Sequence, residues 1–472
     1  MSSELSKNYE FAIIGAGVVG TAIARELTKY TSSVVIIDAQ DDVGAETSKA
    51  NTAILHTGFD MKPNTIESQL VSQGYKLLLD YARQSAICVE QTGAILAAWN
   101  QDEFAELNNI QKRAIENGYL NSRLLSSAEI QKLEPNLGSG VLGGLEIPDE
   151  FIIDPWSVSI AFATQAKKAG ADFKFDSEVL AISQNPGGFT IRTTKENIAC
   201  TYIINAAGLY SDLIDRYLGF SDLEINPRRG ELIVFDKMAR NLVHHIILPV
   251  PTKMGKGVLV SPTIFGNIML GPTAVDVTDK EDKSTTEEGI NYLLQKGELL
   301  APQLLNEEIT TMYTGLRAAS NQPDYFIKRR EAMQYITIGG IRSTGLTASM
   351  AIAKYVVKLV QEVKPELKEF KEHATVKMPV LGESFTRPYQ DDGAIAANPL
   401  NGEIICHCEH VTKGEILEAL QSELPPRSLS GLSRRTRACL GRCQGFYCYA
   451  NIEAIFAQNL EQKDSLGVHN NE

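Results

Sequence analysis

The sequence predicts an α/β protein that ends in a small unit of different character. Near the N-terminus, two short apolar runs flank a glycine-rich turn and a helical stretch, which is the order of a βαβ unit. Further along, runs such as FKFDSEVLAI, GFTIRTT and YIINAAG indicate more strands. Five of the 7 cysteines gather near the C-terminal end, and residues 403–472 are therefore predicted to form a unit of their own.

The glycine-rich turn predicts a dinucleotide site. Phe11–Ile14 is the first apolar run, Val34–Ile37 is the second, and the turn between them contains Gly15, Ala16, Gly17, Val18, Val19 and Gly20. The first glycine permits a tight bend, the second lets the backbone approach a pyrophosphate, and the third lets helix and strand pack closely. Asp38, at the end of the second run, is placed to accept a hydrogen bond from a ribose hydroxyl. The alternative is a tight turn without a ligand.

The composition is that of an ordinary globular chain, with 43% apolar and 22% charged residues. It excludes a disordered chain, a fibre and a small disulfide scaffold. The 45 basic and 58 acidic residues give a net charge of −13, which disfavours nucleic acid as a partner. No apolar stretch is long enough to cross a membrane, and the N-terminal residues lack the apolar core of a signal peptide. We expect a cytoplasmic protein, with peripheral contact at the inner face of the membrane left open.

The C-terminal cysteines predict a metal or cluster site in a reducing compartment. Cys406 and Cys408 form one pair and Cys443 and Cys448 form another, so the two pairs together offer four thiolates. Such a set suits an iron–sulfur cluster or a structural zinc ion. Cys439 lies between the pairs and is either a spare thiol or an alternative ligand.

Three segments resemble the FAD-contact segments of flavoprotein oxidoreductases. Ala207 and Gly208 end an apolar strand that resembles the second such segment, and Val179 matches the position whose backbone meets the adenine. The late segment, which approaches the flavin ring and ribityl chain, is matched by residues 339–347, including Gly340, Gly345, Leu346 and Thr347. No second glycine motif of the first kind occurs in the sequence, so the resemblance implies one FAD.

Several further motifs together resemble the D-amino-acid-oxidase-like superfamily, and within it the FAD-dependent glycerol-3-phosphate dehydrogenase/oxidase group. They are SKANTAILHTG at 48–58, PRRGE at 227–231, PTKMGKG at 251–257, SPT at 261–263, GPTA at 271–274, GLR at 315–317 and RSTGLT at 342–347. The pattern covers nearly the whole chain. It is also similar to L-2-hydroxyglutarate oxidising enzymes, although the PTKMGKG and GPTA segments fit the first group better.

This resemblance implies roles for particular residues. His56 is the candidate base for the substrate hydroxyl, because a histidine titrates near neutral pH. Lys256 faces the flavin, and Arg317 binds the anionic group of the substrate. Arg342 and Ser343 are candidates to assist Arg317, and the segment holding Ser48, Asn51 and Thr52 lies against the FAD.

The C-terminal unit resembles the bacterioferritin-associated-ferredoxin-like 2Fe-2S domain, through the C-x-C-E, RRTR and GRCQG-x-x-C patterns. This resemblance makes Cys406, Cys408, Cys443 and Cys448 the cluster ligands. Cys439 stands where the pattern usually has a small residue such as glycine. Four arginines lie beside these ligands in the sequence: Arg434, Arg435, Arg437 and Arg442. They could offset the negative charge of the cluster, form a docking face, or form a solvated basic face.

We therefore expect a Rossmann-like FAD-binding domain with an interleaved α+β substrate domain that contains an antiparallel sheet, followed by a linker and a small helical iron–sulfur domain. The expected bounds are about 8–85, 145–220 and 325–370 for FAD binding, 86–144 and 221–324 for the substrate domain, 376–402 for the linker and 403–472 for the 2Fe-2S domain. Residues 60–135 are expected to be mostly helical.

The expected activity is oxidation of sn-glycerol 3-phosphate, with electrons passing from FAD through a 2Fe-2S cluster to an acceptor. A partner redox subunit, a quinone or another electron-transfer protein are the candidate acceptors. The alternatives are oxidation of L-2-hydroxyglutarate or of an amino acid or opine, and a non-catalytic electron-transfer flavoprotein.

Overall fold

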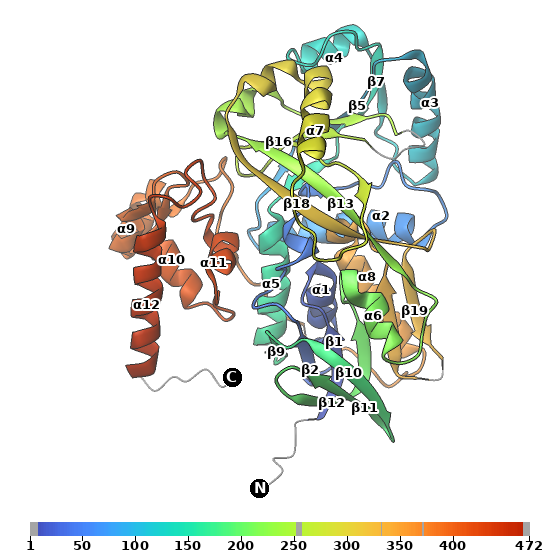
Figure 1. Cartoon of the computed structure of the whole chain (residues 1–472), viewed down its shortest axis with the longest axis vertical. Coiled ribbons are helices and arrows are strands. Elements are labelled where there is room, and N and C mark those ends of the chain that lie inside the picture. The colour runs from blue at the N-terminus through green and yellow to red at the C-terminus, as the bar shows by residue number, and fades with distance from the viewer. Residues whose placement is uncertain (1–7, 252–256, 332, 371, 466–472) are drawn as a thin grey trace.

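The computed structural model describes residues 8–251, 257–331, 333–370 and 372–465. Figure 1 shows a sheet with helices in its lower half, a second sheet flanked by helices above it, and the C-terminal residues in red beside helix α5 (Pro155–Lys168). Within the described residues, no helix is both long enough and apolar enough to pass through a bilayer.

The lower sheet carries the predicted βαβ unit. Strands β20 (Tyr335–Gly339), β12 (Asn197–Asn205), β1 (Asn8–Ile14), β2 (Val34–Ile37) and β9 (Asp172–Lys174) run parallel in this order. The antiparallel strands β10 (Val179–Asn185), β11 (Gly188–Thr193) and β19 (Phe326–Arg330) extend it. All five parallel strands end at one edge, which is where ligands bind in sheets of this kind.

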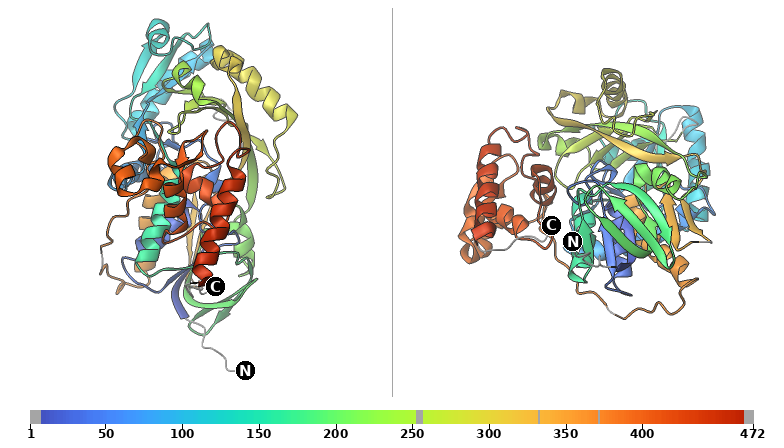
Figure 2. Two further views of the ribbon diagram at one scale, coloured as in Figure 1. Left: turned by 90° about the vertical axis from the view of Figure 1, so that its left-hand side faces the viewer. Right: turned by 60° about the horizontal axis from the view of Figure 1, so that its bottom comes forward.

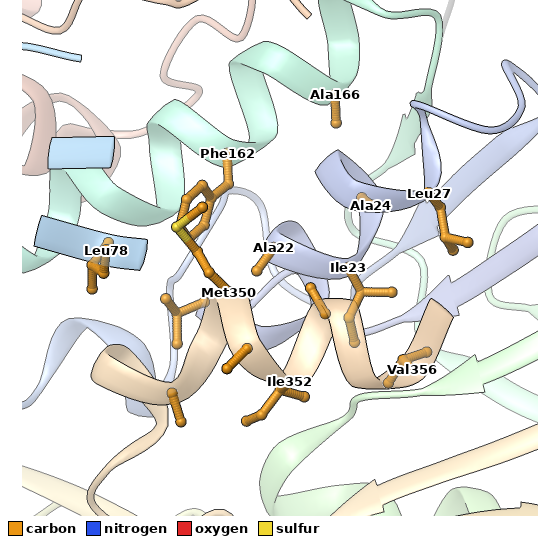
Figure 3. Close-up of a cluster of buried hydrophobic side chains, with 14 of the residues drawn as sticks. Ala22, Ile23, Ala24, Leu27, Leu78, Phe162, Ala166, Met350, Ile352 and Val356 are labelled. Atoms are coloured by element: carbon orange, nitrogen blue, oxygen red, sulfur yellow. The ribbon is translucent and has the colours of Figure 1, made fainter. Parts of the chain in front are cut away.

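Helices α1 (Val18–Leu27), α5 and α8 (Gly345–Gln361) pack together against this sheet. Figure 3 shows Ala22 and Ile23 of α1 above Ile352 and Val356 of α8, with Phe162 of α5 next to Met350. These side chains are buried, and together they form the largest apolar core of the molecule's described part. Helix α2 (Ile66–Gln84) also packs on α8, through Leu78 and its neighbours.

The upper sheet is mostly antiparallel. Its order is β17 (Val275–Asp276), β13 (Ile225–Phe235), β16 (Ile268–Gly271), β15 (Leu259–Pro262), β14 (Ile246–Pro249), β5 (Ala94–Ala98), β7 (Gly143–Ile147) and β6 (Arg123–Ser126), and the long strand β18 (Ile309–Ser320) also pairs with β13. Helices α3 (Gln101–Glu116), α4 (Ser127–Leu133) and α7 (Glu287–Leu300) flank it. A small third sheet, β3 (Ile54–Leu55), β8 (Phe151–Ile153) and β4 (Val89–Gln91), completes the large part.

The C-terminal unit contains the hairpin β21 (Ile404–Cys406) and β22 (Val411–Thr412) and the helices α10 (Lys413–Leu420), α11 (Leu429–Thr436) and α12 (Tyr449–Ser465). Thr412 and Glu415 form the predicted capping box of α10. Figure 2 shows α11 on the side of this unit that faces the large part. Residues 376–402, predicted as a linker, include the short helix α9 (Asp392–Ala397) and pack on both neighbours through Leu381 and Arg387.

The predicted fold class is confirmed, with one local difference. Residues 60–135 contain β4, β5 and β6 as well as α2, α3 and α4. All five residues of β5, with the sequence AILAA, are buried, so the segment lacks the alternation by which a strand is recognised.

Candidate active site and cluster site

The glycine turn lies at the carboxyl end of β1 and has the close contacts that its glycines predict. A Cβ atom on Gly15, which has φ +109°, would collide with the carbonyl oxygen of Ala206. A Cβ on Gly20 would collide with the carbonyl oxygen of Gly15. A Cβ on Gly17 would meet only the Ser48 Oγ, at 3.1 Å. Gly15 and Gly20 are thus required by the fold, while Gly17 keeps the backbone accessible beside Ser48.

Two other predicted cofactor residues, Asp38 and Ser48, contact this turn. Asp38 accepts hydrogen bonds from the backbone N–H of Ala16 at 2.5 Å and of Gln40 at 2.8 Å, and burial raises its pKa to about 6. Ser48 Oγ accepts a hydrogen bond from the N–H of Val18 at 2.9 Å. Ala207 and Gly208 follow β12, and the Ala207 N–H donates to the side chain of Asn205. Val179 is buried at the start of β10.

The helices that begin at the turn and at the late segment are suited to hold phosphates and a flavin. Neither α1 nor α8 has an N-cap side chain that accepts a hydrogen bond, and neither has an acidic residue in its first turn. In contrast, α2, α3, α4, α5 and α7 all begin with a side-chain cap. Apart from the Val18 N–H, which donates to Ser48, the N–H groups at the start of α1 and α8 are therefore available to an anionic ligand, which is the arrangement that a dinucleotide requires.

His56 lies against both the late segment and a buried carboxylate. Its backbone N–H donates to Thr347 Oγ1 at 3.1 Å, at the start of α8. Its Nδ1 lies 3.3 Å from Oε2 of Glu150, whose side chain is fully buried. Glu150 also accepts hydrogen bonds from the N–H and the hydroxyl of Thr57, at 2.8 and 2.7 Å. The carboxylate thus holds the imidazole in place, as the partner of a histidine base does.

The prediction from sequence missed Glu150. Its role depends on the antiparallel pairing of β3 with β8, in which Leu55 faces Phe151. This register places His56, the residue after Leu55, beside Glu150, the residue before Phe151. A pairing of two such short strands has no signature in the sequence that would have revealed it.

Arg317 lies in β18 close to the predicted flavin segment. Thr47 and Gly315 connect this strand to residues 47–51: the Thr47 hydroxyl donates to the Leu316 carbonyl oxygen at 2.9 Å, and a Cβ on Gly315 would lie 2.6 Å from the Ala50 oxygen. The Arg317 guanidinium donates to the Thr273 carbonyl oxygen at 2.6 Å. Burial, with a smaller contribution from Arg228, lowers the Arg317 pKa to about 10. An anionic ligand would compensate this buried positive charge.

The remaining predicted substrate residues are less closely connected to the site. Arg342, with φ +46°, donates to the Gln322 carbonyl oxygen at 2.7 Å and lies 3.9 Å from Glu67, so it stabilises the late segment. Ser343 is exposed. Asn51 donates to the Ser48 carbonyl oxygen at 2.7 Å and shapes the turn that includes Thr52. Lys256 lies outside the described residues.

The five C-terminal cysteines gather in one place as two contacting pairs and an additional thiol. Cys406 contacts Cys448, Cys408 contacts Cys443, and the Cys439 Sγ lies 3.5 Å from the Cys448 Sγ. Burial raises the pKa of Cys406 and of Cys448 to about 11, so bound iron has to displace these protons. In the described part of the chain, no three Cys, His, Asp or Glu side chains form the compact donor set of a single ion. Two thiolate pairs fit a two-iron cluster.

Cys439 occupies a glycine-like backbone position. Its φ is +67°, in the left-handed region that glycine adopts without strain. This conformation explains why a small residue is usual at this place in the pattern. A Cβ on Gly445, which also has a positive φ, would lie 3.2 Å from the Cys439 side chain.

The arginines beside the ligands do not form a solvated basic face. Arg434, Arg435 and Arg437 are each 5% exposed. Arg434 and Arg435 bind Asp42, in the loop after β2, and Arg437 donates to Glu409. A solvated basic face is therefore excluded for these three residues, and Arg434 and Arg435 instead join the C-terminal unit to the large part of the chain. Arg442 is more exposed and bridges to Glu308 at 2.7 Å.

Fold and site together define a flavin-dependent oxidoreductase with an appended iron–sulfur domain. Residues 10–359 match the family model described as FAD dependent oxidoreductase (DAO), and residues 404–458 match the BFD-like [2Fe-2S] binding domain. The chain belongs to the FAD dependent oxidoreductase family, which confirms the resemblance found in the sequence. FAD and a 2Fe-2S cluster are its cofactors.

Three similar proteins narrow the relationship. The chain is 35% identical over 459 residues to a glycerol 3-phosphate dehydrogenase of Caloramator mitchellensis, covering 96% of this chain and 94% of that protein. It is 30% identical to the human mitochondrial L-2-hydroxyglutarate dehydrogenase over 66% of this chain and 72% of that protein. A solved structure of dithionite-reduced L-alpha-glycerophosphate oxidase from Mycoplasma pneumoniae with FAD bound matches with a TM-score of 0.72 and 28% identity, over 79% of this chain and 97% of that one.

Proposed function

We propose that this enzyme oxidises the secondary alcohol of sn-glycerol 3-phosphate to dihydroxyacetone phosphate. The observation that carries the proposal is the His56–Glu150 pair, in which a histidine is held by a buried carboxylate and connected to the start of α8 through Thr347. The similarity of this chain to the Caloramator dehydrogenase over nearly the full length of both proteins supports the choice of substrate.

The residues divide the chemistry between them. FAD, when bound along the glycine turn and the starts of α1 and α8, supplies the acceptor for the hydride from the alcohol carbon. His56 takes the proton of the hydroxyl as that hydride leaves, so that a C=O bond forms. Glu150 orients the imidazole and stabilises its protonated form. Arg317 binds the phosphate through its planar guanidinium, whose charge burial has already desolvated. Lys256 is proposed as a second cation at the flavin.

We further propose that the two electrons leave one at a time through the 2Fe-2S cluster to an external acceptor. A quinone, a partner subunit or another electron-transfer protein would serve as this acceptor. Phe446 and Tyr447, close to Cys443 in the sequence, are exposed, so an acceptor can approach this side of the cluster unit. The presence of a one-electron carrier in the same chain supports an acceptor other than oxygen alone.

An anaerobic substrate screen tests the proposal. Glycerol 3-phosphate, L-2-hydroxyglutarate and a set of amino acids would each be added to the loaded enzyme while the flavin absorbance is followed. We expect glycerol 3-phosphate to bleach the flavin fastest. Faster bleaching by L-2-hydroxyglutarate would instead assign a carboxylate to Arg317, and no bleaching by any of the compounds would favour a non-catalytic electron-transfer role.

A further inference from the structure

The cluster unit is held to the large part of the chain by buried, charge-assisted hydrogen bonds. Arg435 binds Asp42 through two parallel bonds of 2.6 and 2.8 Å, and Arg434 adds a third of 2.8 Å. Asp42 is 2% exposed and each arginine is 5% exposed. Buried bidentate pairs of this kind are strong and geometrically specific.

Asp42 belongs to the loop that lines the predicted FAD site. In this loop, residues 38–48, Asp38 and Ser48 contact the glycine turn at either end. Between them, the Gly44 N–H donates to the Ala16 carbonyl oxygen at 3.0 Å. Only Val43 therefore separates Asp42, which binds the cluster unit, from Gly44, which hydrogen-bonds directly to the glycine turn.

Apolar packing surrounds this charged contact. Val43, Ile160 and Ala163 of the large part form a buried cluster with Leu424 of the C-terminal unit. Figure 2 shows α11, which carries the two arginines, next to α5, which carries Ile160 and Ala163. The contact therefore excludes water around Asp42.

A second contact connects the cluster ligands to the flavin segment. Glu409, next to Cys408, binds Arg437 at 3.1 Å and also binds Lys237, which follows strand β13 of the upper sheet, at 3.3 Å. The Arg437 guanidinium lies 4.2 Å from the centre of the Phe265 ring, and Phe265 stacks on Trp156. The Trp156 indole N–H then donates to the Lys49 carbonyl oxygen at 3.1 Å, one residue after Ser48.

We propose that Asp42 is a positioning residue that docks the iron–sulfur domain on the FAD-binding loop and thereby sets the position of the cluster relative to the flavin. This inference rests on the proposed function, because it concerns electron transfer between the two cofactors. The electrons of the substrate then pass to the cluster of the same chain, and the docked arrangement is the one in which they do so.

Two substitutions on opposite faces of the contact test the proposal. Asp42→Asn removes the charge that the two arginines bind. Gly431→Ala, in α11, would place a Cβ 2.5 Å from Asp42 Oδ2 and force the carboxylate away. Because alanine favours a helix more than glycine does, the second variant weakens the contact without weakening α11. The control is Asp176→Asn, which breaks the 2.8 Å pair with Arg427, also between the two parts but over 40% exposed on both sides.

The first readout is hydrogen exchange of the holoenzyme, which reports docking without turnover. We expect exchange in residues 38–48 and 424–437 to rise in both test variants, since removing one partner of a buried pair lowers a docking constant on the order of a hundredfold. We expect no change in Asp176→Asn. The double variant should be no worse than the worse single one, because both substitutions act on the same contact.

The second readout is rapid mixing with glycerol 3-phosphate, followed by flavin absorbance and by electron paramagnetic resonance of frozen samples. We expect flavin reduction at the normal rate and cluster reduction slowed roughly tenfold or more in both test variants. Unchanged exchange together with unchanged cluster reduction would overturn the proposal. Failure of the unsubstituted protein to reduce its flavin would contradict the proposed function instead, and the exchange readout would still decide the docking.

Discussion

The flavin site and the cluster site of this protein are built in opposite ways. The flavin site takes its residues from the ends of four strands far apart in the sequence, and it offers mainly backbone groups: a glycine turn and two helices without side-chain caps. The cluster site takes its thiols from one stretch, residues 406–448, and offers side chains. The comparison shows that the first site depends on how the sheet is assembled, whereas the second depends mostly on local spacing.

The largest expected effect comes from the backbone at the glycine turn. Gly15→Ala should abolish FAD binding, because the new Cβ collides with the Ala206 carbonyl oxygen on the neighbouring strand. FAD content of the purified protein measures this. Gly118→Ala is the matched control, since Gly118 also has a positive φ but its Cβ would meet open space. Full FAD content in the Gly15 variant would show that the turn tolerates a side chain.

Removing the proposed base, His56, should affect the chemistry without loss of the cofactor. We expect His56→Ala to retain FAD and to reduce the rate of flavin reduction by substrate about 10²–10⁴-fold, the usual contribution of a general base. Anaerobic stopped-flow absorbance measures the rate, and His244→Ala, at an exposed histidine, is the control. A near-normal rate in the His56 variant would exclude it as the base.

Substituting Glu150, the buried partner of the proposed base, should have a smaller effect. Glu150→Gln can still accept the hydrogen bonds of Thr57 but loses the charge that faces His56. We expect flavin reduction to slow roughly 10- to 100-fold, because the buried charge that stabilises the protonated imidazole is lost. In a His56→Ala background the same substitution should have almost no further effect. Fully additive effects would mean that Glu150 acts independently of the histidine.

Asp38 should favour FAD binding but lower the stability of the FAD-free protein as pH rises. Its pKa in the folded protein is raised from 3.8 to about 6, so between these values the folded state binds more protons than the unfolded state. Its contribution to the free energy of unfolding of the FAD-free protein therefore falls as pH rises through this window. Asp38→Asn should reduce that pH dependence in urea unfolding and weaken FAD binding about tenfold. An unchanged FAD affinity would contradict the proposed contact with the ribose.

The smallest effect is expected at the additional thiol of the cluster site. Cys439→Gly should leave the visible and paramagnetic spectra of the cluster unchanged and should stabilise the unit by about 1 kcal/mol, because glycine adopts a positive φ without strain. Thermal unfolding of the holoenzyme measures the gain. Loss of the cluster in this variant would identify Cys439 as a ligand.

The same contrast explains what the sequence predicts well. The βαβ unit and the 2Fe-2S motif are continuous stretches whose residue types are dictated by local geometry, so Gly15, Gly20 and the cysteine pairs are visible directly. The start of helix α10 was also predictable, since Thr412 and Glu415 form a capping box within four consecutive positions. Strand β5, which is buried on both faces, was not.

The residues that sequence reasoning missed all depend on long-range pairing. Glu150 reaches His56 only through the register of β3 and β8, and Asp42 meets Arg434 and Arg435 only because α11 packs on α5. Isolated acidic residues in loops are common, and nothing local distinguishes these two from solvated ones. Their function lies in partners that the chain brings together from more than 90 positions away.

We have proposed that one chain carries electrons from an alcohol through its flavin to its own cluster. The most direct test is a single anaerobic turnover of the holoenzyme with glycerol 3-phosphate, sampled by flavin absorbance and by paramagnetic resonance in the same time course. We predict that the flavin bleaches first and that the signal of the reduced cluster then rises at a rate independent of protein concentration. A cluster that stays oxidised while the flavin remains bleached, or whose reduction depends on protein concentration, would contradict it.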